Sequence, residues 1–316
     1  MIRCIKKGLI YLPTANWDWS LTHSQVPVAD LISNNKIRIY FATRDKKNIS
    51  RTSYVEVEAS NPSKIIYVHD KPVLDIGKIG TFDDCGVMPS CIVNHDDKKY
   101  MYYIGWTIRN TIPYHNSIGL AVSEDGGETF KKIYQGPILT STPKEPYFCG
   151  TSYVIIENNI WKMWYLSCTG WIDVDGKIEP LYHIKYASSQ DGINWQRDGV
   201  VAIDYKNTNE GGIVSASVLK ENGIYKMWYS YRNFFDYRTN KNNSYRIGYA
   251  ESQDGIKWQR LDERFEFIGS NAAENSWDSI MNCYPNVIKF NDKKYMFYNG
   301  NGFGKSGFGY AIIESK

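Results

Sequence analysis

The stretch EGGIVSASVLKENGIYKMWYSYRNFFDYRTNKNNSYRIGYAESQDGIKW, residues 210–258, contains three short apolar runs separated by polar segments. The runs are IVSASVL, YKMWYSYR and SYRIGYAES, and each is rich in β-branched or aromatic residues. Gly, Asn and Asp between them are typical of turns that join consecutive antiparallel strands. The same arrangement recurs before and after this stretch, so the sequence predicts a repeat protein.

Five copies of the pattern can be aligned by their first strands. These read VPVADLI from Val26, MPSCIV from Met88, GTSYVI from Gly150, VSASVL from Val214 and CYPNVI from Cys283. The equivalent residues Pro27, Pro89, Thr151, Ser215 and Pro285 are 62, 62, 64 and 70 residues apart. A second strand follows in each copy: KIRIYFATR, KYMYYIGW, WKMWYLSC, YKMWYSYR and KYMFYNGN. A third strand follows each second strand, and we refer to the copies as units one to five.

Four-stranded repeats at this spacing predict an all-β fold, a five-bladed β-propeller of four-stranded antiparallel blades in which residues 1–316 form a single domain. Unit five ends after its third strand, at GFGYAIIESK, whereas residues 3–12 have no place in unit one. We therefore expect the N-terminal strand to complete the last blade and close the ring. The turns SEDGGETF, SQDGINW and SQDGIKW suit a tight Asp-Gly turn, and we expect their role to be structural.

Composition excludes several classes of protein. The 42% of hydrophobic residues is ample for a core, and the 25 Tyr and 10 Trp suit both β-sheets and sugar-binding surfaces. The 37 basic and 34 acidic residues are mixed along the sequence, which does not favour a nucleic-acid partner. No apolar run approaches the roughly 20 residues of a membrane span. The six cysteines lack CxxC spacing, so we expect reduced thiols and a soluble cytoplasmic protein.

Carboxylates precede four of the five first strands at nearly the same distance. They are Asp83 and Asp84 in unit two, Glu145 in unit three, Glu210 in unit four and Asp278 in unit five. In a propeller, the starts of the first strands converge on one mouth, so these groups would form a ring around the axis. Glycosidic cleavage needs two carboxyl groups, about 5 to 9.5 Å apart. The alternative is that each is a solvated turn residue.

The loops between second and third strands are expected at the same mouth. Aromatic rings together with Arg, Asn and Asp suit a polyol ligand, although each could be an ordinary loop residue. The expected contributions are Arg44 and Asp45, Trp106 and Arg109, Trp171 and His183, Arg232, Asn233 and Arg246, and Asn299, Asn301 and Lys305. Unit one lacks a matching acid, but Trp17, Asp18 and His23 lie upstream of its first strand.

From about Asn16 to Tyr310 the sequence resembles the five-bladed propeller superfamily of glycosidases, which includes arabinanases, β-xylosidases (glycoside hydrolase family 43), invertases, levansucrases and mannoside phosphorylases. The strand pattern, the turns ASSQDGINW and AESQDGIKW, and the recurring acids carry the resemblance. It implies a glycosidase without an obligatory cofactor. An axial Ca²⁺ occurs in this superfamily, but no ligand cluster here indicates one.

The sequence departs from the superfamily pattern within the first strands. Arabinanase-like members have a catalytic Asp at positions where this protein has Val26, Met88 and Tyr284. Their acid Glu often lies in an EGP sequence, which Glu210-Gly211-Gly212 resembles at a larger distance from the second strand. These departures leave the assignment of the catalytic residues to the recurring acids.

We therefore expect a glycoside hydrolase-like enzyme that cleaves or transfers a glycosyl unit of a small oligosaccharide or activated sugar. Asp84 or Asp83 would be one carboxylate, Glu145 and Glu210 would serve as acid and base or nucleophile, and Asp18 is a further candidate. Trp17, Asp278 and Tyr284 join the loop residues as expected substrate contacts.

Two alternatives remain. An inverting phosphorylase or glycosyltransferase would use Arg44, Arg109, Arg232, Arg246 and Lys305 as a phosphate-binding cluster. A propeller that binds glycan or protein without catalysis would explain the missing acids within the first strands.

Overall fold

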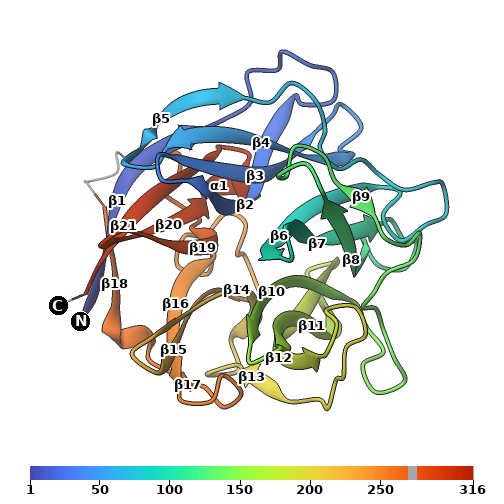
Figure 1. The fold of residues 1–316 in the computed structure, drawn as a ribbon. Coiled ribbons are helices and arrows are strands. Elements are labelled where there is room, and N and C mark those ends of the chain that lie inside the picture. The colour runs from blue at the N-terminus through green and yellow to red at the C-terminus, as the bar shows by residue number, and fades with distance from the viewer. Residues whose placement is uncertain (270–275, 316) are drawn as a thin grey trace.

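The strands form three sheets in the computed structural model, which describes residues 1–269 and 276–315 (Figure 1). One sheet has five strands and the other two have eight each. Each eight-stranded sheet consists of two four-stranded units that are joined by one parallel bridge, Ser50 to Gly86 in one sheet and Tyr182 to Gly212 in the other. The strand units therefore follow the repeats of the sequence.

Each unit pairs its strands antiparallel in sequence order. Unit one contains β2 (Thr22–Ser33), β3 (Lys36–Arg44), β4 (Ser50–Glu58) and β5 (Asn61–Val68); unit two contains β6 (Gly86–His95), β7 (Lys98–Thr107), β8 (His115–Ser123) and β9 (Lys131–Lys132). Unit three contains β10 (Cys149–Glu157), β11 (Ile160–Val174), β12 (Lys177–Ser189) and β13 (Val201–Ile203); unit four contains β14 (Glu210–Glu221), β15 (Ile224–Asn233), β16 (Arg246–Ser252) and β17 (Gln259–Arg260).

The last unit combines both ends of the sequence. It contains β19 (Cys283–Phe290), β20 (Lys293–Asn299) and β21 (Phe308–Ser315), and β1 (Ile2–Tyr11) pairs antiparallel with β21. This pairing confirms the prediction that the N-terminal strand joins unit five. The sequence did not predict β18 (Phe265–Ile268), which pairs parallel with the outer edge of β1 after the short 3₁₀ helix η1 (Asp262–Arg264). A short helix, α1 (Asn301–Gly304), lies between β20 and β21.

The first strands of the five units surround a common centre (Figure 1). Hydrogen bonds join each neighbouring pair: Asn94 to Asp30, Ser90 to Ser152, Ser215 to Thr151, Val287 to Ser217, and Ala29 to Asn286. We call the end at which these five strands begin the axial end. The second strands finish there and the third strands start there, so the loops expected to form a mouth do share one end of the molecule.

The repeated Asp-Gly turns connect neighbouring units. Tyr40 of unit one donates a hydrogen bond to the Gly127 carbonyl of unit two, at 2.9 Å. Tyr102 and Trp164 make the equivalent bonds to the turns of units three and four, at 2.8 and 2.9 Å. Each donor is an aromatic residue at the same position of a second strand. The turns therefore stabilise the packing between units, in agreement with the structural role predicted for them.

Candidate functional site

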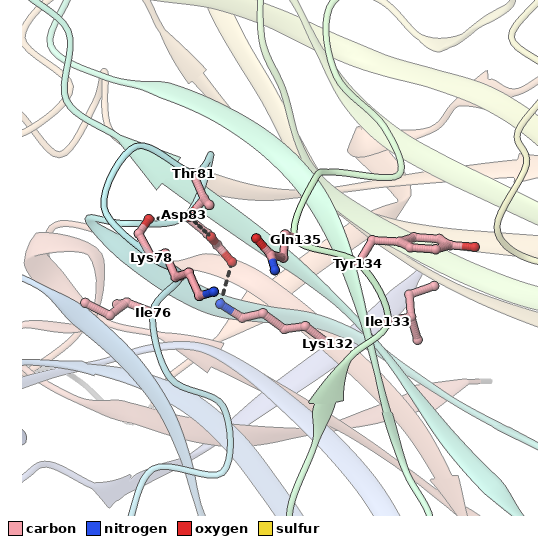
Figure 2. Close-up of a pocket in the computed structure, with 9 residues that line it drawn as sticks. Ile76, Lys78, Thr81, Asp83, Lys132, Ile133, Tyr134 and Gln135 are labelled. Carbon is pink, nitrogen blue, oxygen red and sulfur yellow. Dashed lines mark hydrogen bonds and ion pairs between the residues drawn. The ribbon is translucent and has the colours of Figure 1, made fainter.

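Asp83 is fully buried inside unit two, with 1% of its surface exposed (Figure 2). Its carboxylate accepts hydrogen bonds from the Tyr103 hydroxyl at 3.0 Å and the Thr81 hydroxyl at 2.9 Å. The Lys132 ammonium, on the outermost strand β9, lies 2.6 Å from Asp83 Oδ2. Asp83 thus points toward the outer strand of its own unit and forms one wall of a cleft of about 430 Å³.

Unit three repeats this arrangement with Glu145, which is also buried. Tyr165, the counterpart of Tyr103, lies 3.0 Å from both carboxylate oxygens of Glu145. Lys185 and Arg197 each approach the carboxylate to 3.4 Å. The acid that precedes the first strand is again held by a second-strand tyrosine and by basic residues from the outer part of the unit.

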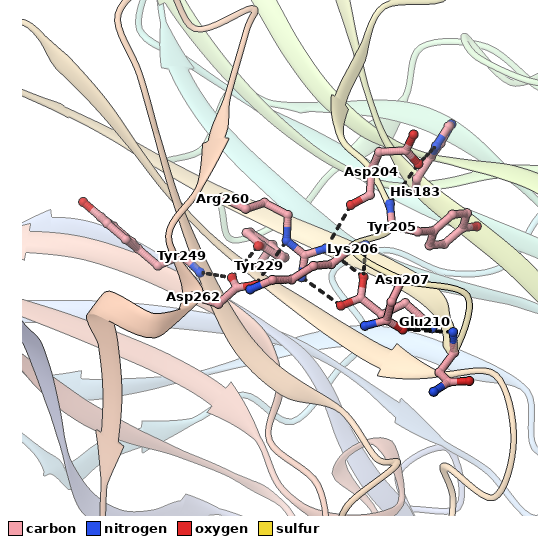
Figure 3. Close-up of polar contacts among 11 residues, drawn as sticks. His183, Asp204, Tyr205, Lys206, Asn207, Glu210, Tyr229, Tyr249, Arg260 and Asp262 are labelled. Atoms are coloured by element: carbon pink, nitrogen blue, oxygen red, sulfur yellow. Dashed lines mark hydrogen bonds and ion pairs between the residues drawn. The ribbon is translucent and has the colours of Figure 1, made fainter.

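Unit four contains a variant of the arrangement (Figure 3). Arg260 of β17 binds both oxygens of Glu210, at 2.7 and 3.0 Å, and also reaches Asp262 at 2.7 Å. The tyrosine at the equivalent second-strand position, Tyr229, donates to Asp262 instead of Glu210. Asp262 therefore adds a second carboxylate to the same guanidinium.

In unit five the basic residue comes from the other end of the sequence. Lys6 of β1 lies 2.9 Å from Asp278, and Tyr298 of β20 donates to Asp278 at 2.8 Å. Lys6 opposes Ala311 in the sheet, just as Lys132 opposes Ala121 and Arg260 opposes Ala250. The N-terminal strand thus supplies the cation that β9 and β17 supply in units two and four. In unit three, Lys185 of β12 and Arg197, which precedes β13, take this place. We call each of these four groups of acid, tyrosine and cation a clip.

Unit one has no acid at this position and also lacks the other two members of the clip. Phe41 occupies the second-strand position of the tyrosine, and Val68 opposes Val55 where the other units have the cation. Phe41 packs in an apolar cluster with Val55, and Val68 packs against that cluster. Acid, hydroxyl and cation are therefore present together in four units and absent together in the fifth, which indicates one structural element with three interdependent parts.

This geometry corrects one expectation. The acids predicted to form a ring around the axis, Asp83, Glu145, Glu210 and Asp278, each point toward the outer strands of their own unit, and their contacts lie there. No hydrogen bond joins any two of them in the described part of the protein. Their catalytic role stays a prediction, but the reason given for it, convergence at the axis, is wrong because the tyrosine and cation of each unit hold the carboxylate outward.

Two further candidate acids belong to no clip. Asp84 is partly exposed and accepts a hydrogen bond from the Gly80 amide at 3.0 Å. Burial raises the pKa of Asp84, but hydrogen bonds from Gly80, Cys85 and Thr107 outweigh it and hold the pKa below its usual value. Because its pKa is lowered, Asp84 is ionised at neutral pH and suits a base or a nucleophile better than an acid.

Asp18 is exposed, and the neighbouring Trp17 stacks on Trp19.

Aromatic side chains fill the axial end on the side of units three and four. Phe148, Tyr182, Tyr237 and Tyr245 are buried in one cluster, against which Trp171 packs. Sequence reasoning missed the tyrosines of this cluster and also Glu179, a buried carboxylate that accepts a hydrogen bond from Tyr237 at 2.7 Å and pairs with Arg238. The signal for Tyr182 and Glu179 was the long hairpin of β11 and β12, which extends beyond the length of the other units. Tyr237 and Tyr245 lie instead in the loop between β15 and β16.

The predicted phosphate-binding cluster of five basic residues does not assemble. Arg232 is completely buried, with Tyr182, Tyr237 and Tyr245 around its guanidinium. Arg246 lies over the ring of Tyr231 instead. The prediction of one matched cluster is therefore wrong, because the tyrosines that enclose Arg232 separate it from any ligand.

Several other expected contacts have structural partners. His183 is buried with Nδ1 3.0 Å from Asp204, and burial lowers its pKa (Figure 3). Asn233 donates to Asn243 at 2.8 Å, and the Trp106 ring nitrogen donates to Ser50 at 2.9 Å. Asn299 is fully buried. Arg109 is exposed, whereas Tyr284 is partly buried next to the aromatic cluster.

Arg44, Lys305 and His23 come together at the unit-one side of the axial end. Arg44 is partly buried, and its Nε donates to Gln25 at 2.8 Å. Burial and the charges of Arg44 and Lys305 lower the pKa of His23 to about 4. In the described ranges, neither Arg44 nor Lys305 forms an ion pair with a carboxylate. The unit-one side of the axial end thus carries unpaired positive charge, whereas the acid of every clip has a cation within 3.4 Å.

Neither a metal cluster nor a membrane helix is found in the described part of the protein. Residues 1–269 and 276–315 hold no group of three His, Cys, Asp or Glu side chains arranged for a metal ion. Within the same residues, no helix has the length and apolar character needed to cross a membrane.

Some known proteins are similar to this protein in sequence, and others are similar to it in fold. Two proteins of Mycobacterium tuberculosis, the uncharacterized proteins Rv1502 (strain H37Rv) and MT1551 (strain CDC 1551), are 35% identical over 312 residues, covering 98% of this chain and 99% of each relative. The protein belongs to the family of these two relatives. No family model matches the sequence.

Solved structures of glycoside hydrolases have the same fold. A glycosyl hydrolase from Bacteroides ovatus superposes with a TM-score of 0.69 at 16% identity, covering 96% of this chain and 90% of the other. A thermostable family-43 glycoside hydrolase gives 0.63 at 18%, covering 95% and 90%. A BT0996 complex with RGII gives 0.67 at 19%, covering 98% and 91%. The resemblance to the propeller glycosidase superfamily is confirmed at the level of the fold.

Proposed function

We propose that the five units are the blades of one closed propeller domain spanning residues 1–316. The cycle of hydrogen bonds between first strands supports this reading. The position of Lys6 supports it independently, because β1 supplies to unit five the cation that the outermost strand supplies in units two and four. A cytoplasmic location remains part of the proposal.

We propose further that the protein is a carbohydrate-active enzyme that cleaves or transfers a glycosyl unit at the axial end. The observation that carries this proposal is the fold shared with glycoside hydrolases over nearly the whole sequence. One of these neighbours is a complex with RGII, which supports an oligosaccharide as the ligand class. Trp171 and Phe303, which pack against the aromatic cluster and are only partly buried, add rings of the kind that stack on sugars.

Among the predicted carboxylates, Asp84 is the first to test. It is partly exposed and ionised, and within the described residues it forms no ion pair of the kind that holds the clip acids. Asp18 comes second because it is exposed. Glu145 and Glu210 come last, because substituting either would also break a clip and confuse a loss of activity with a loss of folding.

The test is a screen of the purified protein against aryl glycosides and short oligosaccharides, with and without phosphate. We expect turnover that Asp84→Asn reduces at least about 100-fold, the lower range for a lost acid–base group, without lowering the melting temperature. The matched control is Asp70→Asn, an exposed unit-one acid. Turnover that survives in Asp84→Asn would remove Asp84 from the catalytic set, and no turnover on any substrate would favour a propeller that only binds glycan.

A further inference from the structure

Backbone contacts bring His23, Arg44 and Lys305 together from three separate elements. Arg44, the last residue of β3, pairs with Thr22, the residue before His23. The loop that carries Lys305 lies against the start of β2, because the Asn299 side chain donates to the Ser24 carbonyl at 2.6 Å. Two of the three residues, His23 and Arg44, come from unit one, and Lys305 comes from unit five, far away in the sequence.

The close approach of this loop also requires glycine at position 304. A Cβ atom on Gly304 would lie 2.5 Å from the Ser24 carbonyl oxygen, and its φ of 88° is in the left-handed region. The segment before Lys305 is therefore fitted to the start of β2, which fixes where the ammonium group emerges.

The group carries a positive charge for which the described residues provide no counter-ion. Arg44 is partly buried, and its only hydrogen bond to a side chain in the described structure goes to the neutral amide of Gln25. Lys305 is exposed and has no carboxylate partner among the same residues, and His23, whose pKa is lowered to about 4, is neutral at pH 7. The net charge of the group is therefore +2. Arg44 is partly removed from solvent without a carboxylate partner, so this arrangement fits an anion that arrives with the ligand.

Several of the residues with positive φ lie next to this group, and other such residues occur elsewhere in the protein. Val26, Tyr284 and Phe303 have φ values of 52°, 55° and 59°, and His23 has 63°. Positive φ is unfavourable for β-branched and bulky residues. The strain is maintained by buried hydrogen bonds, such as the one from the Val26 amide to Asn299 at 2.7 Å. Such strained positions gather at ligand sites, where the surrounding structure holds them in place.

We propose that His23, Arg44 and Lys305 bind a phosphate group, either on a sugar substrate or as free inorganic phosphate. Phosphate monoesters carry a charge of about −1.5 to −2 at pH 7, which matches the +2 of the group, whereas a single carboxylate would leave one positive charge unbalanced. The terminal nitrogens of Arg44 offer a planar pair of donors, Lys305 a point charge, and His23 a neutral ring nitrogen. The inference rests on the proposed function only in treating the phosphate as part of a substrate.

The test measures binding directly, so that it does not depend on turnover. Inorganic phosphate and a hexose 1-phosphate are titrated by calorimetry at constant ionic strength, with chloride as the balancing ion. We expect saturable binding that Lys305→Gln and Arg44→Gln each weaken about tenfold or more, as for a lost charge-assisted bond. Lys71→Gln, which removes an exposed lysine of unit one, should bind like the parent.

A spectroscopic signature separates binding at this site from a general charge effect. Phosphate should raise the pKa of His23 from its low value, seen as a shift of one histidine ring signal that disappears in His23→Gln. The same signal should not move on addition of chloride at equal ionic strength.

The two probes distinguish the sources of phosphate. Tighter binding of the sugar phosphate would indicate a phosphorylated substrate, and equal or tighter binding of inorganic phosphate would indicate a co-substrate; both support the site. Absence of binding by either probe at millimolar concentration would overturn the proposal, as would binding that Arg44→Gln and Lys305→Gln leave unchanged. A protein that binds phosphate but turns over no glycoside would refute the proposed function and leave this site standing.

Discussion

The clips and the unit-one side of the axial end differ in whether their charged side chains are paired within the protein. In each clip a buried carboxylate has its own cation, at distances of 2.6 to 3.4 Å, and a tyrosine or second carboxylate completes the group. At the axial end, Arg44 and Lys305 have no carboxylate among the described residues. Charge that the protein balances internally contributes to folding, whereas charge that it leaves unbalanced is available to a ligand. The difference distinguishes structural ionisable residues from candidate functional ones.

The largest effect should follow removal of the strand that completes the clip of unit five. Deleting residues 1–12 removes Lys6 from Asp278, and with it the buried side chains of Cys4, Ile10 and Tyr11. Each buried apolar side chain contributes about 1.5 to 3 kcal/mol, so a loss of more than about 5 kcal/mol is expected, together with a sharply lower melting temperature in calorimetry. A truncated protein that melts like the full-length one would contradict ring closure by β1.

A smaller but still large effect should follow from breaking one clip. Asp83→Asn leaves the Lys132 ammonium buried without its counter-charge, and about 3 to 5 kcal/mol of stability should be lost in urea unfolding. The double variant with Lys132→Met should recover part of that loss, giving a coupling energy of about 1 to 3 kcal/mol. Additive losses would show that the two residues act separately.

Unit one supplies the matched control for this measurement. Phe41→Tyr places a hydroxyl group where no acid is present, in an apolar cluster with Val55, and should cost about 1 to 3 kcal/mol. Tyr103→Phe in unit two should also destabilise, because it removes a donor from Asp83. If Phe41→Tyr were tolerated without loss, the joint absence of the three clip members in unit one would need another explanation.

The sequence was sufficient for the repeat, the order of the strands and the pairing of β1, because each depends on a local pattern or on a missing fourth strand. It was insufficient for the direction of the acids. Spacing places Asp83 before a first strand, but only the packed unit shows that Tyr103 and Lys132 draw it outward. The signal was present in the sequence, since Phe41 and Val68 replace the polar members in the one unit without an acid.

The roles of the basic residues at the axial end were also hard to predict, because they too depend on how each side chain packs. Five basic residues in equivalent loops appeared interchangeable, yet burial beneath tyrosines removes Arg232 from any ligand, and Arg246 lies over Tyr231. His23 was noted only as lying upstream of unit one. Its proximity to Arg44 and Lys305 depends on the contact between the two ends of the repeat, which no local pattern in the sequence encodes.

The smallest effect on stability is expected at the axial end. Removing a charged side chain there should leave the stability nearly unchanged or raise it, whereas removing one from a clip should lower it. Arg44→Met removes a partly buried guanidinium that donates to the neutral Gln25 side chain, and no carboxylate is left behind. Stability should therefore stay within about 1 kcal/mol of the parent or rise, because the desolvated charge no longer has to be accommodated. Lys305→Gln, at an exposed position, should change stability by less than about 0.5 kcal/mol. Both variants are compared with Asp83→Asn by urea unfolding without phosphate. A loss of several kcal/mol from Arg44→Met would mean that the guanidinium is as structural as the cations of the clips, and the distinction between balanced and unbalanced charge would fail.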